Sequence, residues 1–306
     1  MTDIKELKDI KDHSFQSFIS FISSIHYITS RKLMDTIDLN RALEFALATA
    51  KKGADLAVEY HKAGADLDVE NKSPRDFVTE ADFDVQNLII DEIKKNYPEH
   101  GVVAEEKGAD NIGNPDSPYI WVIDPIDGTK PFMHGREEFG VILGLMKNEE
   151  VILGVMILPL QNDEFKCIKG QGVFYNNKPV VLRKTKDMNE AMICTNFRGR
   201  ERIIDGIPYV PVPLCTSIEN YGCAADELGK ILKGQNDGAT FHGPRIWDLA
   251  VGFMMIEEAG GKAEWQLDDP DDVRSAVLGC ASTEPIFDDL RKFTFETSAS
   301  LTLRKD

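Results

Sequence analysis

The sequence has little that would point to a membrane, to a disulfide framework or to a nucleotide-binding loop. No apolar stretch reaches the roughly 18 residues that a transmembrane helix needs. Only five cysteines occur among 306 residues, and no two form a CxxC pair, which argues against a zinc site and against disulfide bonds. GxGxxG and P-loop motifs are also missing. We therefore expect a cytoplasmic protein whose thiols are reduced.

Basic residues are scarce relative to acidic ones. The chain has 35 lysines and arginines against 52 aspartates and glutamates, which gives a formal net charge of −17. A surface of this charge repels nucleic acid and anionic membranes. Binding to a phosphate backbone would need a local basic patch or metal ions. We therefore expect neither a membrane nor a nucleic acid as partner.

Residues 1–34 are interpreted as an accessory N-terminal extension. Ser14–Ile28 is mildly apolar, but lysines and acids alternate in the sequence before it. Such mixed charge does not fit a signal peptide, and the acids do not fit a transit peptide. Met34 stands just before a well-patterned helix and is a candidate second start site. The extension is either a bland appendage or a helix that contacts a partner or a second subunit.

The rest of the chain predicts layered α and β structure, not a repeat of βαβ units. Helical patterns cover residues 38–61, 224–232, 247–259 and 285–293, and strand patterns cover 140–146, 151–158, 192–195, 238–241, 262–265 and 277–281. A capping box at Thr79 and Asp82 predicts a further helix start. A break near 183–190 separates an N-terminal α+β half, residues 35–186, from a C-terminal α/β half, residues 187–306.

The segment WVIDPIDGTKPF, residues 121–132, places Asp124 and Asp127 at the end of an apolar run that reads as a buried strand. Three further acids occupy comparable places: Asp82 at a helix start, Glu105 after a strand and Asp248 at another helix start. Each alone has an ordinary explanation as a helix-terminal acid, a solvated loop or a turn. Acids at strand ends and helix starts nevertheless tend to converge on one crevice in an α/β protein.

Carboxylates that share a crevice need protons or cations. Each pair repels by about 4 kcal/mol at 4 Å when the effective dielectric constant is near 20. A set of oxygen donors without cysteine or histidine suits Mg²⁺ or Mn²⁺ better than zinc. Magnesium usually completes its shell with water and with phosphate oxygens of a substrate. The acids therefore predict a magnesium site that acts on a phosphate.

Four motifs together resemble the signatures of the inositol monophosphatase superfamily. They are DFVTEAD, AEEKG, WVIDPIDGTKPF and WDLAVGFMMIEEAGG, in the expected order, and the resemblance covers about residues 36–290. It implies an αβαβα sandwich of the sugar-phosphatase type, usually a homodimer, with the site between the two halves. It also implies dependence on two or three Mg²⁺ ions per site, with Mn²⁺ as a substitute, and a capacity for inhibition by Li⁺.

The resemblance also implies a role for each residue of the candidate site. The metal ligands would be Glu105, Asp124, the carbonyl of Ile126, Asp127 and Asp248. Gly128 and Thr129 would begin a helix whose amides bind the phosphate, and a side chain at Gly128 would obstruct that approach. A metal-activated water would attack phosphorus in line, while Thr129, hydrogen-bonded to Asp82, would orient and deprotonate it with help from Glu105. Glu106 would either support the ligands or be a plain surface acid.

The substrate is less defined by the motifs. Family members that act on inositol monophosphate or on histidinol phosphate carry a glutamate seven residues before the aspartate of the WD motif, where this chain has Phe241. A lysine directly after the DGT, here Lys130, is similar to the pattern in histidinol phosphatases and in 3′-phosphoadenosine nucleotidases. Lys130 and Arg245 are candidates to bind a second anionic group, with Phe241 packed against a base, or both cations are solvated.

The default prediction is therefore a small phosphate ester, such as inositol monophosphate or a sugar phosphate. The alternatives within the family are a 3′(2′),5′-bisphosphate nucleotidase and a histidinol phosphatase. A scaffold is the alternative outside enzymology, since some bacterial members of the superfamily act in transcription antitermination by binding RNA polymerase and RNA. Every proposed catalytic residue is present, and the acidity of the chain disfavours RNA, so we favour the enzyme.

Overall fold

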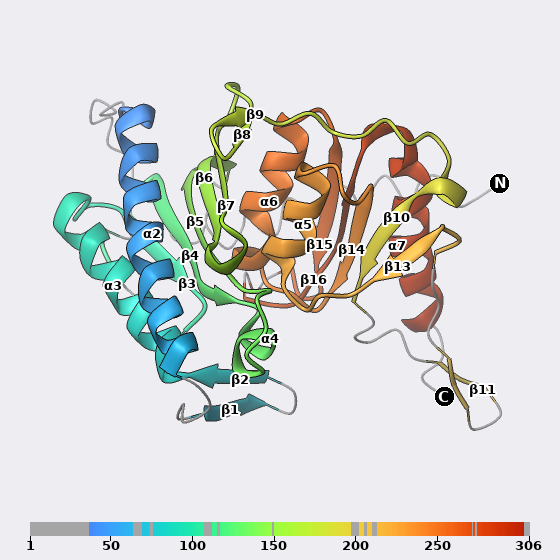
Figure 1. Cartoon of the computed structure of the whole chain (residues 1–306), viewed down its shortest axis with the longest axis horizontal. Coiled ribbons are helices and arrows are strands. Elements are labelled where there is room, and N and C mark those ends of the chain that lie inside the picture. The colour runs from blue at the N-terminus through green and yellow to red at the C-terminus, as the bar shows by residue number, and fades with distance from the viewer. Residues whose placement is uncertain are drawn as a thin grey trace.

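The structure is a computed structural model that describes most of the chain beyond residue 36 (Figure 1). The described residues are 37–63, 69–73, 76–106, 112–114, 117–148, 150–196, 202–204, 207–209, 213–270, 272 and 274–302. The predicted extension, residues 1–34, lies outside them. The described part forms five alternating layers of helices and sheets.

A seven-stranded sheet forms the second layer. Its strands follow chain order: β3 (Gly101–Ala104), β4 (Tyr119–Asp127), β5 (Gly140–Lys147), β6 (Glu150–Leu158), β7 (Asp163–Ile168), β8 (Val173–Tyr175) and β9 (Lys178–Pro179). Only β3 and β4 pair in parallel, and every later pair is antiparallel. The helices α2 (Leu39–Ala63) and α3 (Glu80–Asn96) pack together and cover one face as the first layer.

A mixed five-stranded sheet forms the fourth layer. Its strand order is β13 (Ser217–Glu219), β10 (Met192–Thr195), β14 (Gly238–His242), β16 (Val277–Ser282) and β15 (Lys262–Leu267). The helices α5 (Ala224–Leu232) and α6 (Ile246–Glu258) lie between the two sheets, and α7 (Phe287–Thr302) covers the outer face. Shorter elements are the hairpins β1 (Val69–Ser73) with β2 (Asp76–Thr79) and β11 (Arg202–Ile204) with β12 (Ile207–Tyr209), the helix α4 (Thr129–Met133), and the 3₁₀ turns η1 (Pro159–Gln161), η2 (Met188–Glu190) and η3 (Glu284–Ile286).

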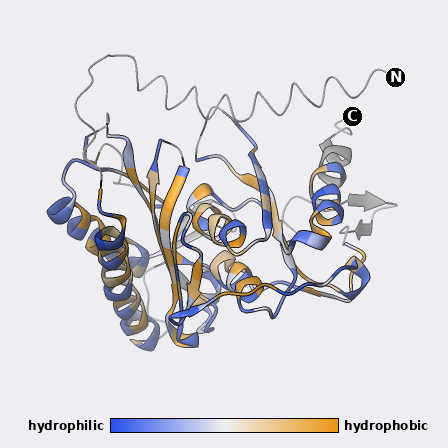
Figure 2. Cartoon of the chain, turned by 90° about the horizontal axis from the view of Figure 1, so that it is seen from above, coloured by the Kyte–Doolittle hydropathy of each residue, from blue (hydrophilic) through white to orange (hydrophobic). Residues whose placement is uncertain are grey.

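The predicted αβαβα sandwich is confirmed by these layers. The helix predicted over 38–61 is α2, and the capping box at Thr79 and Asp82 begins α3. The helix predicted over 224–232 matches α5 at both ends. Hydrophilic residues colour much of the outer helices in Figure 2, whereas hydrophobic ones concentrate on the strands and on the helices between the sheets. Burial of apolar surface by the two sheets therefore explains why α5 and α6 form where they do.

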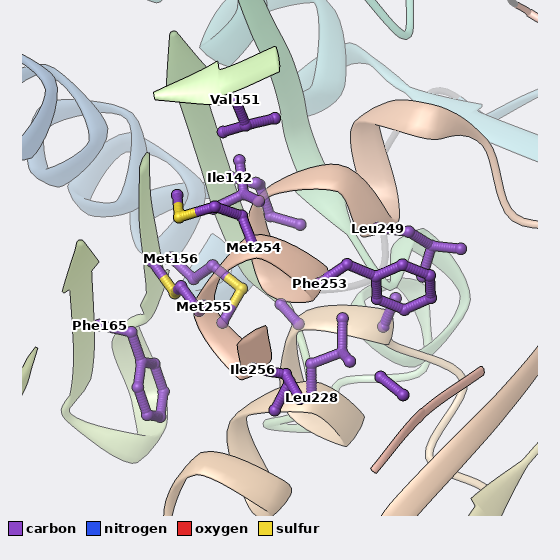
Figure 3. Close-up of a cluster of buried hydrophobic side chains, with 14 of the residues drawn as sticks. Ile142, Val151, Met156, Phe165, Leu228, Leu249, Phe253, Met254, Met255 and Ile256 are labelled. Carbon is purple, nitrogen blue, oxygen red and sulfur yellow. The ribbon is translucent and has the colours of Figure 1, made fainter. Parts of the chain in front are cut away.

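The central core runs through both predicted halves of the chain. Ile142 and Met156 from the first sheet pack in one cluster with Leu228 of α5 and Phe253 of α6 (Figure 3). The division into residues 35–186 and 187–306 therefore stays a prediction, since this core does not stop at its boundary.

Two glycines let α6 lie close to the first sheet. Gly144 on β5 and Gly154 on β6 are cross-strand partners, and a Cβ atom at either would lie 2.5 Å from a methyl group of Val251 on α6. Only a residue without a side chain fits there. This close packing brings the first turn of α6, which carries Asp248, toward the sheet that carries Asp124.

The cysteines carry no disulfide bond in the structure. All five cysteines are free, and four of them are buried. No helix among the described residues combines the length and the apolar character needed to cross a membrane.

Candidate active site

A bulge at the end of β4 changes the direction in which the two aspartates of the DPIDGT motif point relative to each other. β4 pairs regularly with β5 as far as Asp124 opposite Ile142, and pairing resumes at Asp127 opposite Gly140. Three steps along β4 thus match two along β5. Side chains three apart on a regular strand face opposite sides, and the extra residue of a bulge removes that opposition. Both carboxylates are buried, with exposures of 1% and 8%.

The predicted acidic ligands lie close enough to perturb one another. Burial, followed by the charges of Glu105, Asp248 and Asp127, raises the pKa of Asp124 well above its ordinary value. Burial likewise raises the pKa of Asp248 to about 8, with added repulsion from Glu105 and Asp127. The structure therefore brings together the four carboxylates that the sequence singled out on separate segments. The Oδ1 atom of Asp124 is buried and has no hydrogen-bond partner.

Asp127 is held by the first turn of α5, which the sequence reasoning missed. Its Oδ2 atom accepts hydrogen bonds from Ala225 N and from Cys223 Sγ, the latter at 3.1 Å. Burial raises the pKa of Asp127 to about 6, although these two hydrogen bonds oppose the shift. Burial also raises the pKa of the Cys223 thiol well above its ordinary value, so the thiol keeps its proton and can donate it. The start of α5 was predictable, but its contact with a residue nearly one hundred positions earlier had no local signal.

Asp248 is fixed by the backbone at the start of α6. Its Oδ2 atom accepts a hydrogen bond from Arg245 N at 2.7 Å, which satisfies one of the free amides of the first helical turn. One carboxylate oxygen is thereby used for orientation, and the other is left for the cluster. The Arg245 side chain is partly exposed beside it.

Thr129 and Asp82 lie side by side at the starts of α4 and α3. The Thr129 hydroxyl is 3.2 Å from Asp82 Oδ1 and 3.2 Å from the carbonyl oxygen of Ile126, so it can donate to either. Asp82 is fully buried, and its Oδ2 atom accepts from Thr79 N at 2.7 Å and from Thr79 Oγ1 at 2.5 Å. The capping box therefore fixes one oxygen of Asp82 and presents the other to Thr129.

Gly128 occupies a turn that no other residue fits. Its φ of +87° lies in the left-handed region. A Cβ atom there would meet the carbonyl oxygen of Glu138 at 2.7 Å and the Cβ atom of Cys223 at 2.9 Å. The turn joins the acids of β4 to Thr129, the first residue of α4, so the position of the Thr129 hydroxyl depends on this glycine.

One candidate placement needs correction, and one of two alternatives is excluded. Phe241, a candidate to pack against a substrate base, is fully buried on β14 with its ring centroid 5.9 Å from that of Phe253; the ring belongs to the core because α6 covers that face of the second sheet. For Glu106 the surface-acid alternative is excluded, since this residue is 1% exposed. Its backbone exchanges hydrogen bonds with the Gln86 amide, at 2.8 and 3.2 Å. Lys130 is partly exposed, and its role as a substrate contact stays a prediction.

The donor atoms fit a hard divalent cation. In the described part of the chain no group of three or more acidic, histidine or cysteine side chains is arranged to hold a metal ion as it stands. The set nevertheless consists of oxygen donors only, which Mg²⁺ and Mn²⁺ prefer. The unpartnered Oδ1 of Asp124 offers a donor atom, and a bound cation would offset the repulsion that contributes to the raised pKa values of Asp124 and Asp248.

Comparisons with known proteins identify the family of the chain. The model of the "Inositol monophosphatase family" matches residues 38–290. Among the relatives, "Fructose-1,6-bisphosphatase/inositol-1-monophosphatase" of Aquifex aeolicus is 32% identical over 232 residues, which are 73% of this chain and 85% of the relative. "Nus factor SuhB" of Pasteurella multocida is 29% identical over 227 residues, covering 73% and 84%.

Solved structures give the same answer for the fold. The IMPase of Thermotoga maritima superposes with a TM-score of 0.70 at 26% sequence identity, covering 85% of this chain and 99% of the other. The family model spans the segments that carry every acid of the candidate site. The chain belongs to the inositol monophosphatase family.

Proposed function

We propose that the protein is a magnesium-dependent phosphatase that hydrolyses a small phosphate monoester, with inositol monophosphate or a sugar phosphate as the substrate class. The observation that carries the proposal is the buried, unpartnered Oδ1 of Asp124 within a cluster of carboxylates. Burying such a group is costly unless a proton or a cation compensates its charge. Membership of the family supports the same reading.

Each residue of the site has a distinct task in this reaction. Glu105, Asp124, Asp127 and Asp248, with the carbonyl of Ile126, would hold the cations. When bound, these cations would neutralise charge on the phosphate and lower the pKa of the attacking water.

The Thr129 hydroxyl is placed to orient that water. While it donates its proton to Asp82 Oδ1, its lone pairs are left to accept a hydrogen bond from the water. Asp82 is then the group that receives the proton through Thr129, with Glu105 assisting. The short α4 would bring its first amides to the phosphate oxygens.

The metal requirement is tested with one substitution and one control. Hydrolysis of inositol 1-phosphate should need added Mg²⁺ and should stop on exhaustive chelation. Asp124→Asn should remove most of the activity and weaken Mn²⁺ binding in calorimetry, because a neutral amide is a poorer ligand for a hard cation. Asp91→Asn, an exposed position on α3, is the matched control and should change neither. Undiminished activity after chelation would contradict the proposal.

The substrate is the finer question, and Arg245 is the residue that can answer it. If its partly exposed guanidinium binds a second anionic group, a bisphosphate should be preferred over a monophosphate. A charge-assisted hydrogen bond is worth roughly 1.5–3 kcal/mol, or about 10- to 150-fold in kcat/KM. Arg245→Ala and Lys130→Ala should then penalise adenosine 3′,5′-bisphosphate or fructose 1,6-bisphosphate but not inositol 1-phosphate or histidinol phosphate.

The exposed Lys95→Ala serves as the control for the loss of a positive charge. A preference for inositol 1-phosphate that neither site variant alters would assign the monoester. The buried position of Phe241 removes one of the three residues that favoured a nucleotide.

A homodimer and a scaffold role are proposals that activity alone does not test. Light scattering of the purified chain decides the first. The scaffold role is retained as a proposal because the Pasteurella relative is named "Nus factor SuhB". Because the chain carries a net charge of −17, we expect no RNA binding at physiological salt.

A further inference from the structure

The thiol of Cys223 lies where the two halves of the candidate site meet. Its Sγ atom is 3.1 Å from Asp127 Oδ2, and it accepts a hydrogen bond from Asp226 N, in the first turn of α5, at 3.4 Å. The side chain is 1% exposed. The thiol thus joins a helix start to a carboxylate that comes from the other half of the chain.

We propose that Cys223 is a positioning residue that holds Asp127 in the orientation needed to bind a divalent cation. This inference rests on the proposed function. The Cys223 thiol and Ala225 N both donate to the same oxygen, Oδ2, and the backbone of Ala224 adds a further hydrogen bond to the carboxylate. Oδ1, which the thiol and Ala225 N do not use, is the oxygen we assign to the cation, and rotation of the carboxylate would break both bonds to Oδ2.

The surroundings of Cys223 leave it little freedom. Its Cβ atom lies 2.9 Å from the place where a Cβ atom of Gly128 would be, so it packs directly against the turn that follows Asp127. Cys167 offers the contrast: it is equally buried, but its Sγ atom lies 3.3 Å from Met254 Sδ in the same core cluster and contacts a methionine instead of a carboxylate. If the thiols served only for packing, removing either one would have the same effect on cation affinity. If Cys223 positions Asp127, only its removal should lower that affinity.

The test is the affinity of the substrate-free protein for Mn²⁺, measured by calorimetry on the full chain. Partners of metal ligands typically change metal affinity by about 10- to 100-fold, and because a thiol is a weak donor we expect a loss of about 10-fold in Cys223→Ala. Cys223→Ser keeps a donor and an acceptor and should bind within about 3-fold of the wild type. Cys167→Ala is the control for loss of a buried thiol and should keep wild-type affinity.

The outcomes distinguish a failure of the positioning role from a failure of the proposed function. If the wild type binds no Mn²⁺, the proposed function itself fails. If the wild type binds and Cys223→Ala binds equally well, the positioning role is wrong and the function stands. Should Cys223→Ala not fold, Cys223→Ser decides: retained affinity supports the role of the donor, and a loss of about 10-fold or more overturns it.

Discussion

Replacing Gly128 by alanine should lower the free energy of unfolding far more than the same replacement at a nearby glycine that also has a left-handed backbone conformation. Gly128 and Gly135 both have left-handed φ angles, +87° and +69°. A Cβ atom at Gly128 would lie 2.7 Å from the Glu138 carbonyl oxygen, whereas one at Gly135 would have nothing within 4 Å. The left-handed backbone costs an L-residue about 1–2 kcal/mol at either position.

The close contact adds a second cost at Gly128 alone. A backbone carbonyl cannot move aside as a flexible side chain can, and inserting one carbon into a packed site typically costs about 1–3 kcal/mol. We therefore expect Gly128→Ala to lower the free energy of unfolding by about 2–5 kcal/mol, against about 1–2 kcal/mol for Gly135→Ala. Urea denaturation of the two variants beside the wild type measures the difference. Equal midpoints and equal slopes for the two variants would refute the reasoning.

Two further predictions concern the hydroxyl of Thr129 and a half-buried histidine. Thr129→Ala should lower kcat by about 10²- to 10⁴-fold with little change in KM, because the hydroxyl is proposed to act on the attacking water; steady-state kinetics that keep kcat within a factor of about 3 would leave Thr129 only as a helix residue. Burial lowers the pKa of His100 from 6.5 to about 4, with its ring stacked against Tyr97 and Tyr119. Between pH 6.5 and pH 4 the imidazole of His100 is therefore protonated in the unfolded chain and neutral in the folded one. The contribution of this histidine to the free energy of unfolding is present above pH 6.5 and is lost as the pH falls toward 4. Because the ring is only half buried, we expect a loss of about 1–2 kcal/mol. His100→Phe should lose correspondingly less stability between pH 7 and pH 4.5 in urea titrations, and identical losses in both proteins would exclude the histidine as the cause.

The elements that the sequence predicts well are those fixed by local chemistry. The capping box of Thr79 and Asp82 needs only residues three positions apart, and the structure has it at the start of α3. The range of α5 follows from a period of 3.6 residues. The gathering of the acids at strand ends and helix starts was also predictable, because such ends tend to converge in an α/β protein.

The parts that the sequence could not supply depend on distant partners. Phe241 was read correctly as part of a strand, but its burial depends on α6, which covers that face. The hydrogen bond between Cys223 and Asp127 joins residues 96 positions apart, and no periodicity reports such a contact. The order β13-β10-β14-β16-β15 likewise follows from how strands meet in space, not from any one segment.

The hydrogen bonds from the start of α5 to Asp127 have a consequence for the order in which a newly synthesised chain can fold. Ala225 follows Asp127 by 98 residues, an interval that a ribosome needs roughly 5–20 s to translate. Throughout that interval the nascent β4 carries paired aspartates without the amide that restrains one of them, and the sheet face around Ile142 and Met156 lacks its covering helices. Asp248 emerges later still. Closure of the central layer and assembly of the four carboxylates are therefore one late event, and a chain released before α6 would have neither.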